Sequence, residues 1–175
     1  TLPTNPPLTN MRVRVRANGQ RLALTQLTAD VVRGSIRGDI ELPVKQHLAT
    51  QSMQIQLRAK ALSITALTTA ANAAAVMEGQ LDADINLHSS GDTVAEFAGN
   101  SAGAVELLIG SGRAKLRAAE ILTGGLHALG DWLTSTDSDW VKVNCGVAAF
   151  ELRNGTARTS ALMLDTQRTT VTGKG

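Results

Sequence analysis

Aliphatic side chains recur at every second position along most of this chain, and this period of two constrains the fold more than any other feature. Residues 11–17 alternate between aliphatic residues and arginine, and the same alternation returns in residues 52–59, 80–88 and 103–109. Because successive side chains of a β-strand point to opposite faces, each segment predicts a strand with one apolar face. Turn residues separate these segments at intervals of about ten residues, which predicts a mainly β fold built on one extended antiparallel sheet.

The clearest turn lies near the C-terminus, where Asn154-Gly155 separates residues 141–153 from residues 156–165. Both turn positions of a two-residue type I′ turn need positive φ, which these two residues tolerate, so we expect a β-hairpin. This loop length places Glu151 opposite Arg158, an opposite-charge pair that favours the register.

Farther from the tip, the same register makes both faces of the hairpin apolar. It places Cys145 opposite Leu164 and Val147 opposite Leu162. A sheet that is apolar on both faces must be covered on both, or must hold a ligand on one of them. Cys145 is the single cysteine, so it forms no internal disulfide, and we interpret it as a small buried hydrophobe.

Three segments predict helices instead. Residues 64–77 are rich in alanine, and residues 92–98 predict one or two helical turns capped by Asp92 or Gly91. In residues 114–133 the spacing changes to three and four, which predicts an amphipathic helix that covers part of one sheet face. Its apolar stripe comprises Leu116, Ala119, Leu122, Leu126, Leu129 and Leu133. The alternation also slips in phase between Val31 and Gly34, which predicts a bulge or a turn.

Composition limits the class of protein. With 43% hydrophobic and 18% charged residues, the chain is expected to be ordered and globular. Residues 1–10 hold three of the four prolines and predict a flexible lead-in, followed by a single domain over residues 11–175. The absence of an initial Met indicates a piece of a longer protein. A net charge of +2, no cluster of Lys and Arg, and 2% aromatic residues argue against nucleic-acid binding.

Catalytic and metal-binding patterns are weak. The sequence has no Cys-x-x-Cys pair, no phosphate-binding loop and no Gly-x-Ser-x-Gly elbow. Asp82, Asp84 and His88 share one face of a predicted strand, where they could bind a hard cation or act as acid and base. The wet face of a half-buried strand explains them more simply. We therefore predict a non-enzymatic protein without a metal or a cofactor.

Glycine positions add a further pattern. Residues 80–88 lead into Ser90-Gly91 and a short segment that ends at Gly99, and a strand and a glycine step follow. Near the C-terminus come Asn144-Cys145, the Asn-Gly hairpin, Leu-Asp-Thr at residues 164–166 and a short strand that ends at Gly173. These patterns resemble the AsmA family of Gram-negative envelope proteins over residues 11–175, most closely from about residue 78 onward. Gly110-Ser111-Gly112 departs from it, since an acidic residue before a single glycine is more usual there.

The resemblance implies a specific role. AsmA-like proteins carry an inner-membrane anchor and a large periplasmic region, a long curled β-sheet whose apolar inner surface conducts phospholipid between membranes or supports outer-membrane assembly. This chain would be a periplasmic, non-enzymatic groove module, anchored to the inner membrane through a segment outside it. Its partners would be phospholipid or another acyl lipid, together with envelope proteins.

The resemblance and the alternation together predict a curled sheet with about three helices and a dry groove wall. The predicted wall residues are Val13, Val15, Leu22, Leu24, Ile55, Leu57, Ile85 and Leu107. The residue pattern is compatible with a lipid-filled groove and with an ordinary packed core. The alternative function is a structural or partner-binding β-domain that uses exposed sheet edges and holds no lipid.

Overall fold

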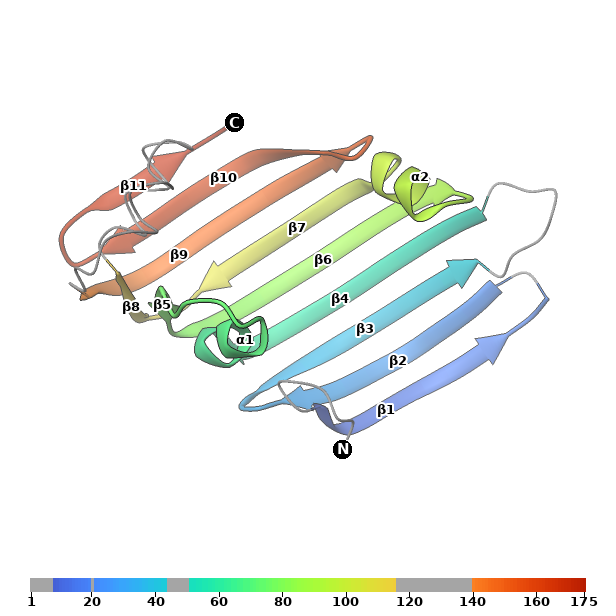
Figure 1. The fold of residues 1–175 in the computed structure, drawn as a ribbon, viewed down its shortest axis with the longest axis horizontal. Helices are drawn as coiled ribbons and strands as arrows, with labels where there is room; N and C mark the ends of the chain where they lie inside the picture. The colour runs from blue at the N-terminus through green and yellow to red at the C-terminus, as the bar shows by residue number, and fades with distance from the viewer. Residues whose placement is uncertain (1–7, 20, 44–50, 116–139) are drawn as a thin grey trace.

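The structure is a computed structural model that describes residues 8–19, 21–43, 51–115 and 140–175. Its strands form one antiparallel, 11-stranded sheet in the order β1-β2-β3-β4-β6-β7-β9-β10-β11, with β5 and β8 paired off this path beside β9 (Figure 1). The strands are β1 (Leu8–Ala17), β2 (Arg21–Val31), β3 (Gly34–Pro43), β4 (Gln51–Ser63), β5 (Met77–Glu78), β6 (Gln80–Gly91), β7 (Ala102–Ile109), β8 (Gly112–Lys115), β9 (Trp140–Arg153), β10 (Thr156–Thr166) and β11 (Thr170–Gly173). The predicted mainly β, antiparallel fold is confirmed.

The predicted strands lie where the alternation placed them, with small differences at their ends. Strand β1 begins at Leu8, inside the segment predicted to be a lead-in. The hairpin of β9 and β10 turns at Asn154 and Gly155, both of which have positive φ, and Glu151 lies opposite Arg158 as predicted. The phase slip after Val31 is the turn between β2 and β3.

Two helices are present among the described residues, and both are short. Helix α1 (Ile64–Ala70) ends well before the predicted residue 77, because Asn72 adopts a left-handed conformation with φ of 51°. The N–H of Ala73 then donates to the carbonyl of Thr68 and that of Asn72 to Thr69, which closes the helix with a Schellman motif.

Helix α2 (Val94–Gly99) starts two residues later than predicted. Its N-cap is Thr93, whose hydroxyl accepts from the Glu96 N–H, so the predicted cap at Asp92 or Gly91 is wrong. The Glu96 carboxylate in turn accepts from the Asp92 N–H at 2.8 Å.

Most of the predicted helix over 114–133, with its leucine stripe, lies outside the described residues; its first two positions belong to strand β8. No helix in the described part of the chain is long and apolar enough to cross a membrane.

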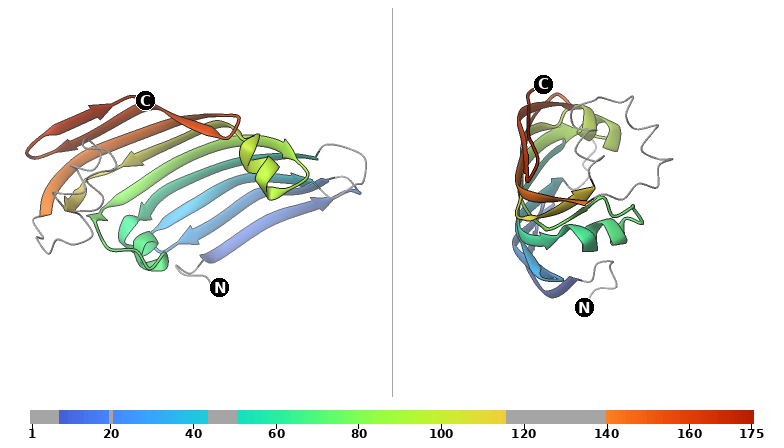
Figure 2. Two further views of the ribbon diagram at one scale, coloured as in Figure 1. Left: turned by 45° about the horizontal axis from the view of Figure 1, so that its top comes forward. Right: turned by 90° about the vertical axis from the view of Figure 1, so that its left-hand side faces the viewer.

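The sheet is open and bowed and is not strongly curled, which corrects the predicted curled sheet (Figure 2). Strands β1 and β11 are its two edges. Strong curvature needs bulges repeated across neighbouring strands. The ladders β3–β4, β6–β7 and β7–β9 run without a register shift, so the middle of the sheet has the ordinary strand twist without rolling up.

Bulges occur elsewhere in the sheet. In two of them, an aspartate on the neighbouring strand accepts a hydrogen bond from the backbone N–H of the bulged residue. In β2, Gln26 has φ of 54°, and its N–H donates to the Asp39 carboxylate at 2.8 Å. In β4, Ala61 has φ of 53°, and its N–H donates to the Asp82 carboxylate at 2.7 Å. Each carboxylate therefore satisfies a backbone donor that the bulge removes from the ladder.

A further bulge lies at Ser160 in β10 and changes the predicted hairpin register. Beyond it, Cys145 lies opposite Asp165 and Val147 lies opposite Met163, so both predicted pairings with leucine are wrong. The extra residue is inserted where the Ser160 hydroxyl donates to the Ala149 carbonyl at 3.1 Å.

The shift at Ser160 places Leu162 opposite Ala148 and Leu164 opposite Gly146. Both leucines therefore point to the same side of the sheet as Ala148 and Phe150, instead of to the opposite side. This placement removes the main reason for expecting two apolar faces.

Most of the buried hydrophobic residues in the described part of the chain lie in two small clusters. The first comprises Ala114, Val143 and Leu164, with Met77 and Val171 packed against them. The second comprises Val31, Ala59 and Leu62, with Leu8, Ile36, Leu67, Leu81 and Ala83 packed against them. Cys145 is only half-buried. Helix α1 contributes Leu67 to the second cluster, so this helix covers one end of the sheet.

Candidate functional site

Strand register shows which side chains share a face, because directly paired residues of an antiparallel sheet point to the same side. One row runs from Leu24 through Ile40 and Ile55 to Leu87 across four strands. A second row runs from Leu57 through Ile85 and Val105 to Phe150 across β4, β6, β7 and β9. These rows carry no charged residue, and we call the surface that contains them the apolar face.

All eight predicted wall residues lie on the apolar face. Val15 is paired with Leu24, and Leu22 and Val13 are two positions from them on the same strands. Ile55 and Leu57 belong to the two rows above, as do Leu24 and Ile85, and Leu107 is paired with Ala83 beside Ile85. The structure therefore brings together residues from five strands.

Other residues enlarge this face beyond the predicted set. Alternation alone gives some of them, since Ile40, Leu42 and Val105 follow the same period. Leu162 reaches the apolar face through the Ser160 bulge, so only the three-dimensional register reveals it.

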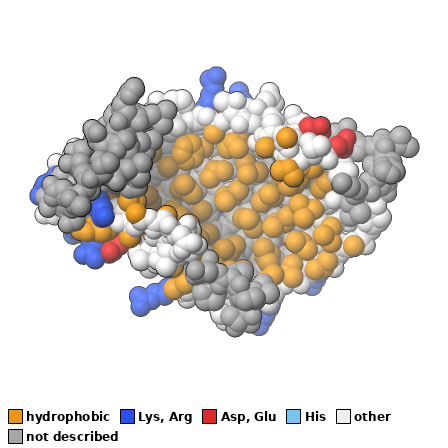
Figure 3. Space-filling view, viewed as in Figure 1, with side chains coloured by type: hydrophobic (Ala, Val, Ile, Leu, Met, Phe, Trp, Pro, Cys, Tyr) orange, Lys and Arg blue, Asp and Glu red, His pale blue; other side chains and the backbone are white. Residues whose placement is uncertain are grey.

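The middle of the apolar face has no second layer over it within residues 8–19, 21–43, 51–115 and 140–175. Figure 3 shows a continuous surface of hydrophobic side chains across the sheet, viewed from this side. Ile55, Leu57, Ile85 and Leu107 are each half-buried, whereas Val13 and Val15 at the β1 edge are 37% and 56% exposed.

The two helices lie on the same side as the apolar face, at opposite ends of the strands (Figures 1 and 2). At the α2 end, Ser89 is buried, and its hydroxyl donates to the Phe97 carbonyl of the helix. At the other end, α1 packs Leu67 on the second core cluster. Together the helices bound the apolar face and leave its middle open.

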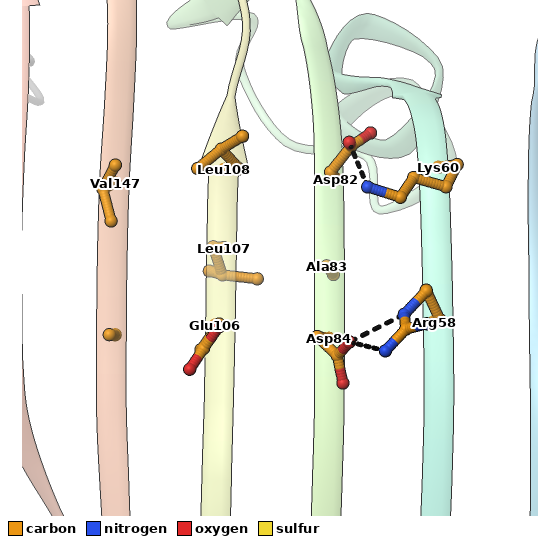
Figure 4. A pocket seen from close by; sticks show the side chains of 10 residues that line it. Arg58, Lys60, Asp82, Ala83, Asp84, Glu106, Leu107, Leu108 and Val147 are labelled. Carbon is orange, nitrogen blue, oxygen red and sulfur yellow. Dashed lines mark hydrogen bonds and ion pairs between the residues drawn. The ribbon is translucent and has the colours of Figure 1, made fainter.

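The opposite face of the sheet carries the charges. Arg58 contacts Asp84 at 2.6 Å and Lys60 contacts Asp82 at 2.7 Å, each pair joining β4 to β6 (Figure 4). They line a shallow depression of about 410 Å³ together with Glu106 and Leu108 among others. We call this surface the charged face, and because its ion pairs suit contact with water, it needs no covering layer.

These contacts account for the two aspartates that were considered as catalytic or metal-binding residues. The Ala61 N–H and then the Lys60 ammonium hold the pKa of Asp82 below its usual value. Asp84 is engaged by Arg58. His88 lies four residues from Asp84 along β6, opposite Gln54. The described residues contain no group of three His, Cys, Asp or Glu side chains able to hold a metal ion. The arrangement of both aspartates is that of structural ion pairs.

Comparison with known proteins agrees with the family resemblance. The sequence profile of the AsmA family matches residues 3–162. The AsmA family protein YhjG of Escherichia coli (strain K12) is 27% identical over 171 residues, which cover 97% of this chain and 24% of that protein. The chain therefore spans about a quarter of the length of this relative. No solved structure matches the chain. Because the profile match covers most of its residues, the chain belongs to the AsmA family.

Proposed function

We propose that this chain is a groove module of a longer envelope protein, and that its apolar face carries the acyl chains of phospholipids between the inner and outer membranes. Membership in the AsmA family implies a role in the cell envelope and in outer-membrane biogenesis. In this proposal the module lies in the periplasm, and a segment outside this chain anchors it to the inner membrane.

The observation that carries the proposal is the continuous aliphatic surface in the middle of the sheet, without a second layer in the described part of the chain. Water-soluble proteins rarely expose contiguous apolar patches larger than a few hundred Å² unless they bind something there. The charged face is turned away from this surface, so the two sides of one sheet suit water and hydrocarbon respectively.

Acyl chains fit this surface for a simple energetic reason. Each methylene transferred from water to an apolar surface contributes about 0.8 kcal/mol. A lipid that slides along the rows of Leu, Ile and Val keeps its methylenes out of water, whereas a lipid that leaves exposes all of them. Head groups would stay in water at the open rim. Such transport requires no covalent chemistry, so the proposed role is non-enzymatic.

Leu107 and Leu108 provide a matched test, because these neighbouring residues point to opposite faces of β7 (Figure 4). Leu107→Asp places a carboxylate on the apolar face, where an unpaired charge beside acyl chains is costly. Leu108→Asp places the same group on the charged face, where Leu108 is already 54% exposed. We expect Leu107→Asp to lower binding of fluorescent phospholipid at least tenfold and Leu108→Asp to retain it.

A second pair, Ile85→Asp and Asn86→Asp, repeats this comparison on β6, and circular dichroism first selects variants that retain the fold. Equal phospholipid binding by the members of each pair, or no binding by the parent, would contradict the groove proposal.

The alternative function is a structural module that joins partner proteins through an edge of the sheet and carries no lipid. Extraction of the purified protein with organic solvent separates the two functions. Co-purified phospholipid supports the groove, and a lipid-free protein that still binds its partner supports the structural module.

A further inference from the structure

A group of charged side chains surrounds Trp140, the residue at which strand β9 begins. Strand β8 lies beside it and pairs with β5 as well as with β9. Register places Glu78 opposite Arg113 and Arg113 opposite Lys142. In the same ladder Lys115 lies opposite Trp140. Because paired residues, and residues two apart on one strand, point to the same side, these five side chains share one face, and we call them the Trp140 cluster.

The other face of this corner of the sheet is packed. Ala114, which lies between Arg113 and Lys115, is fully buried against Val143 in the first core cluster. The packing fixes the backbone of β8 and β9, and the Trp140 cluster points away from it. The Arg113 side chain is 58% exposed. Figure 3 shows Lys and Arg side chains together with an acidic side chain at the end of the molecule where β5 and β8 lie.

Positive charge exceeds negative charge in the Trp140 cluster. Arg113 donates to both carboxylate oxygens of Glu78, from Nε at 2.6 Å and from Nη2 at 3.1 Å. Lys115 and Lys142 take part in no ion pair within the described part of the chain. Like charges directly opposite each other, as in Arg113 and Lys142, are destabilising. An anion bound beside them would offset this repulsion.

The indole ring keeps two of the cations in place beside a hollow. The Arg113 guanidinium lies 5.1 Å and the Lys115 ammonium 5.9 Å from the centroid of the Trp140 ring, within the range of cation–π attraction. A depression of about 630 Å³ adjoins the ring. Gly79 and Gly112 line this depression and have no side chains to fill it. The corner therefore combines fixed positive charge with space for a ligand.

We propose that the Trp140 cluster binds the phosphate group of an anionic phospholipid head group. Guanidinium and ammonium groups are the side chains that bind phosphate, and a phosphate near Arg113 and Lys142 would neutralise their excess charge. Trp is enriched at the head-group level of membranes, where Lys and Arg side chains also reach. The inference goes beyond the proposed function, because the cluster contains none of the eight wall residues of the apolar face.

The test measures binding to vesicles by co-sedimentation. The parent should bind vesicles of phosphatidylcholine with phosphatidylglycerol at least tenfold more tightly than vesicles of phosphatidylcholine alone. Raising the salt concentration from about 50 to 500 mM should reduce this preference, because exposed charges are screened. Equal binding to the two kinds of vesicle at low salt would overturn the inference.

The variant K115Q/K142Q removes the two ammonium groups of the cluster and should lower the affinity for phosphatidylglycerol vesicles at least tenfold. Its matched control, R33Q/K174Q, removes the same net charge at exposed positions outside the cluster and should bind like the parent. Circular dichroism first shows that both variants retain the fold. Unchanged binding by K115Q/K142Q, or an equal loss in the two variants, would overturn the inference.

Two soluble competitors distinguish a lipid head group from other anions. Glycerophosphoglycerol, which is the head group without acyl chains, should displace phosphatidylglycerol vesicles from the parent. If it binds through Lys115 and Lys142 while the vesicles do not bind, the ligand is a water-soluble phosphate ester and the assignment to lipid is overturned. A tetraglutamate peptide should compete at least tenfold more weakly. Equal competition by this peptide would assign the cluster to acidic protein segments and overturn the inference.

Leu107→Asp separates a failure of this inference from a failure of the groove proposal. The variant should no longer extract fluorescent phosphatidylcholine into the soluble fraction and should still bind phosphatidylglycerol vesicles. A parent that extracts phosphatidylcholine without preferring phosphatidylglycerol vesicles overturns this inference and leaves the groove proposal standing. A parent that prefers these vesicles and extracts no lipid supports this inference and contradicts the groove proposal.

Discussion

Two stretches of the apolar face contain the same kinds of residue and differ in what covers them. Near α1, Ala59 and Leu62 are 8% and 7% exposed. Farther along the same strand, Leu57 and Ile55 are only half-buried, although they point to the same side. The cover over a residue, and not its hydrophobicity, sets its burial here. The α1 end therefore stabilises the domain, whereas no described residue covers the middle of the face.

Leu62→Ala should have the largest effect on stability, because Leu62 lies in the buried cluster with Val31 and Ala59. Removing a buried leucine side chain costs about 2–5 kcal/mol when the cavity does not collapse. Urea denaturation measures the loss, with Leu108→Ala as the exposed control. Superimposable curves for Leu62→Ala and the parent would contradict the distinction between the covered end and the open middle.

Leu57→Ala should cost less, about 1 kcal/mol, because its side chain is only half-buried before any ligand binds. Added phospholipid should then raise the Tm of the parent more than that of the variant, since a bound ligand stabilises the state to which it binds. A loss as large as that of Leu62→Ala in lipid-free protein would indicate that the middle of the face is already covered.

Asp82→Asn tests the charged face and should cost about 1 kcal/mol at neutral pH, since its ion pair with Lys60 is partly exposed. The folded state lowers the pKa of Asp82, so its contribution is fully present above the unfolded value of about 3.9 and is lost as the pH falls through the folded value. Denaturation at several pH values should show the parent and Asp82→Asn converging in acid. A difference that is constant down to about pH 2 would assign the effect to the geometry of the Ala61 hydrogen bond instead of the charge.

The sequence predicted the turn and the strands correctly where residues within the same segment determine them. The hairpin register near the turn follows from Asn154 and Gly155. Glu151 lies opposite Arg158 as expected, although its carboxylate contacts Arg153 of the same strand. The strands of the apolar face follow from alternation for the same reason. The family resemblance was likewise readable from glycine positions and strand order.

The predictions were wrong where a single residue ends a helix or shifts the alternation of side chains along a strand. The alanine-rich segment has helix propensity through residue 77, yet the left-handed Asn72 stops α1. Ser160 carries no pattern that marks it as a bulge, because its hydrogen bond goes to a neighbouring strand and not to a residue beside it in sequence. The openness of the sheet depends on the regular central ladders, which no single segment reveals.

The bulges at Gln26 and Ser160 allow a strand of this sheet to contain one extra residue without changing the face of the side chains that follow. Leu24 and Leu27 are three positions apart, as are Thr159 and Leu162, yet each pair reaches the same face because one extra residue is absorbed between its members. Each bulge thus restores the face to which the following side chains of its strand point. Without the extra residue at Ser160, each following side chain of β10 would point to the opposite face of the sheet. Leu162 and Leu164 would then lie on the charged face instead of the apolar face.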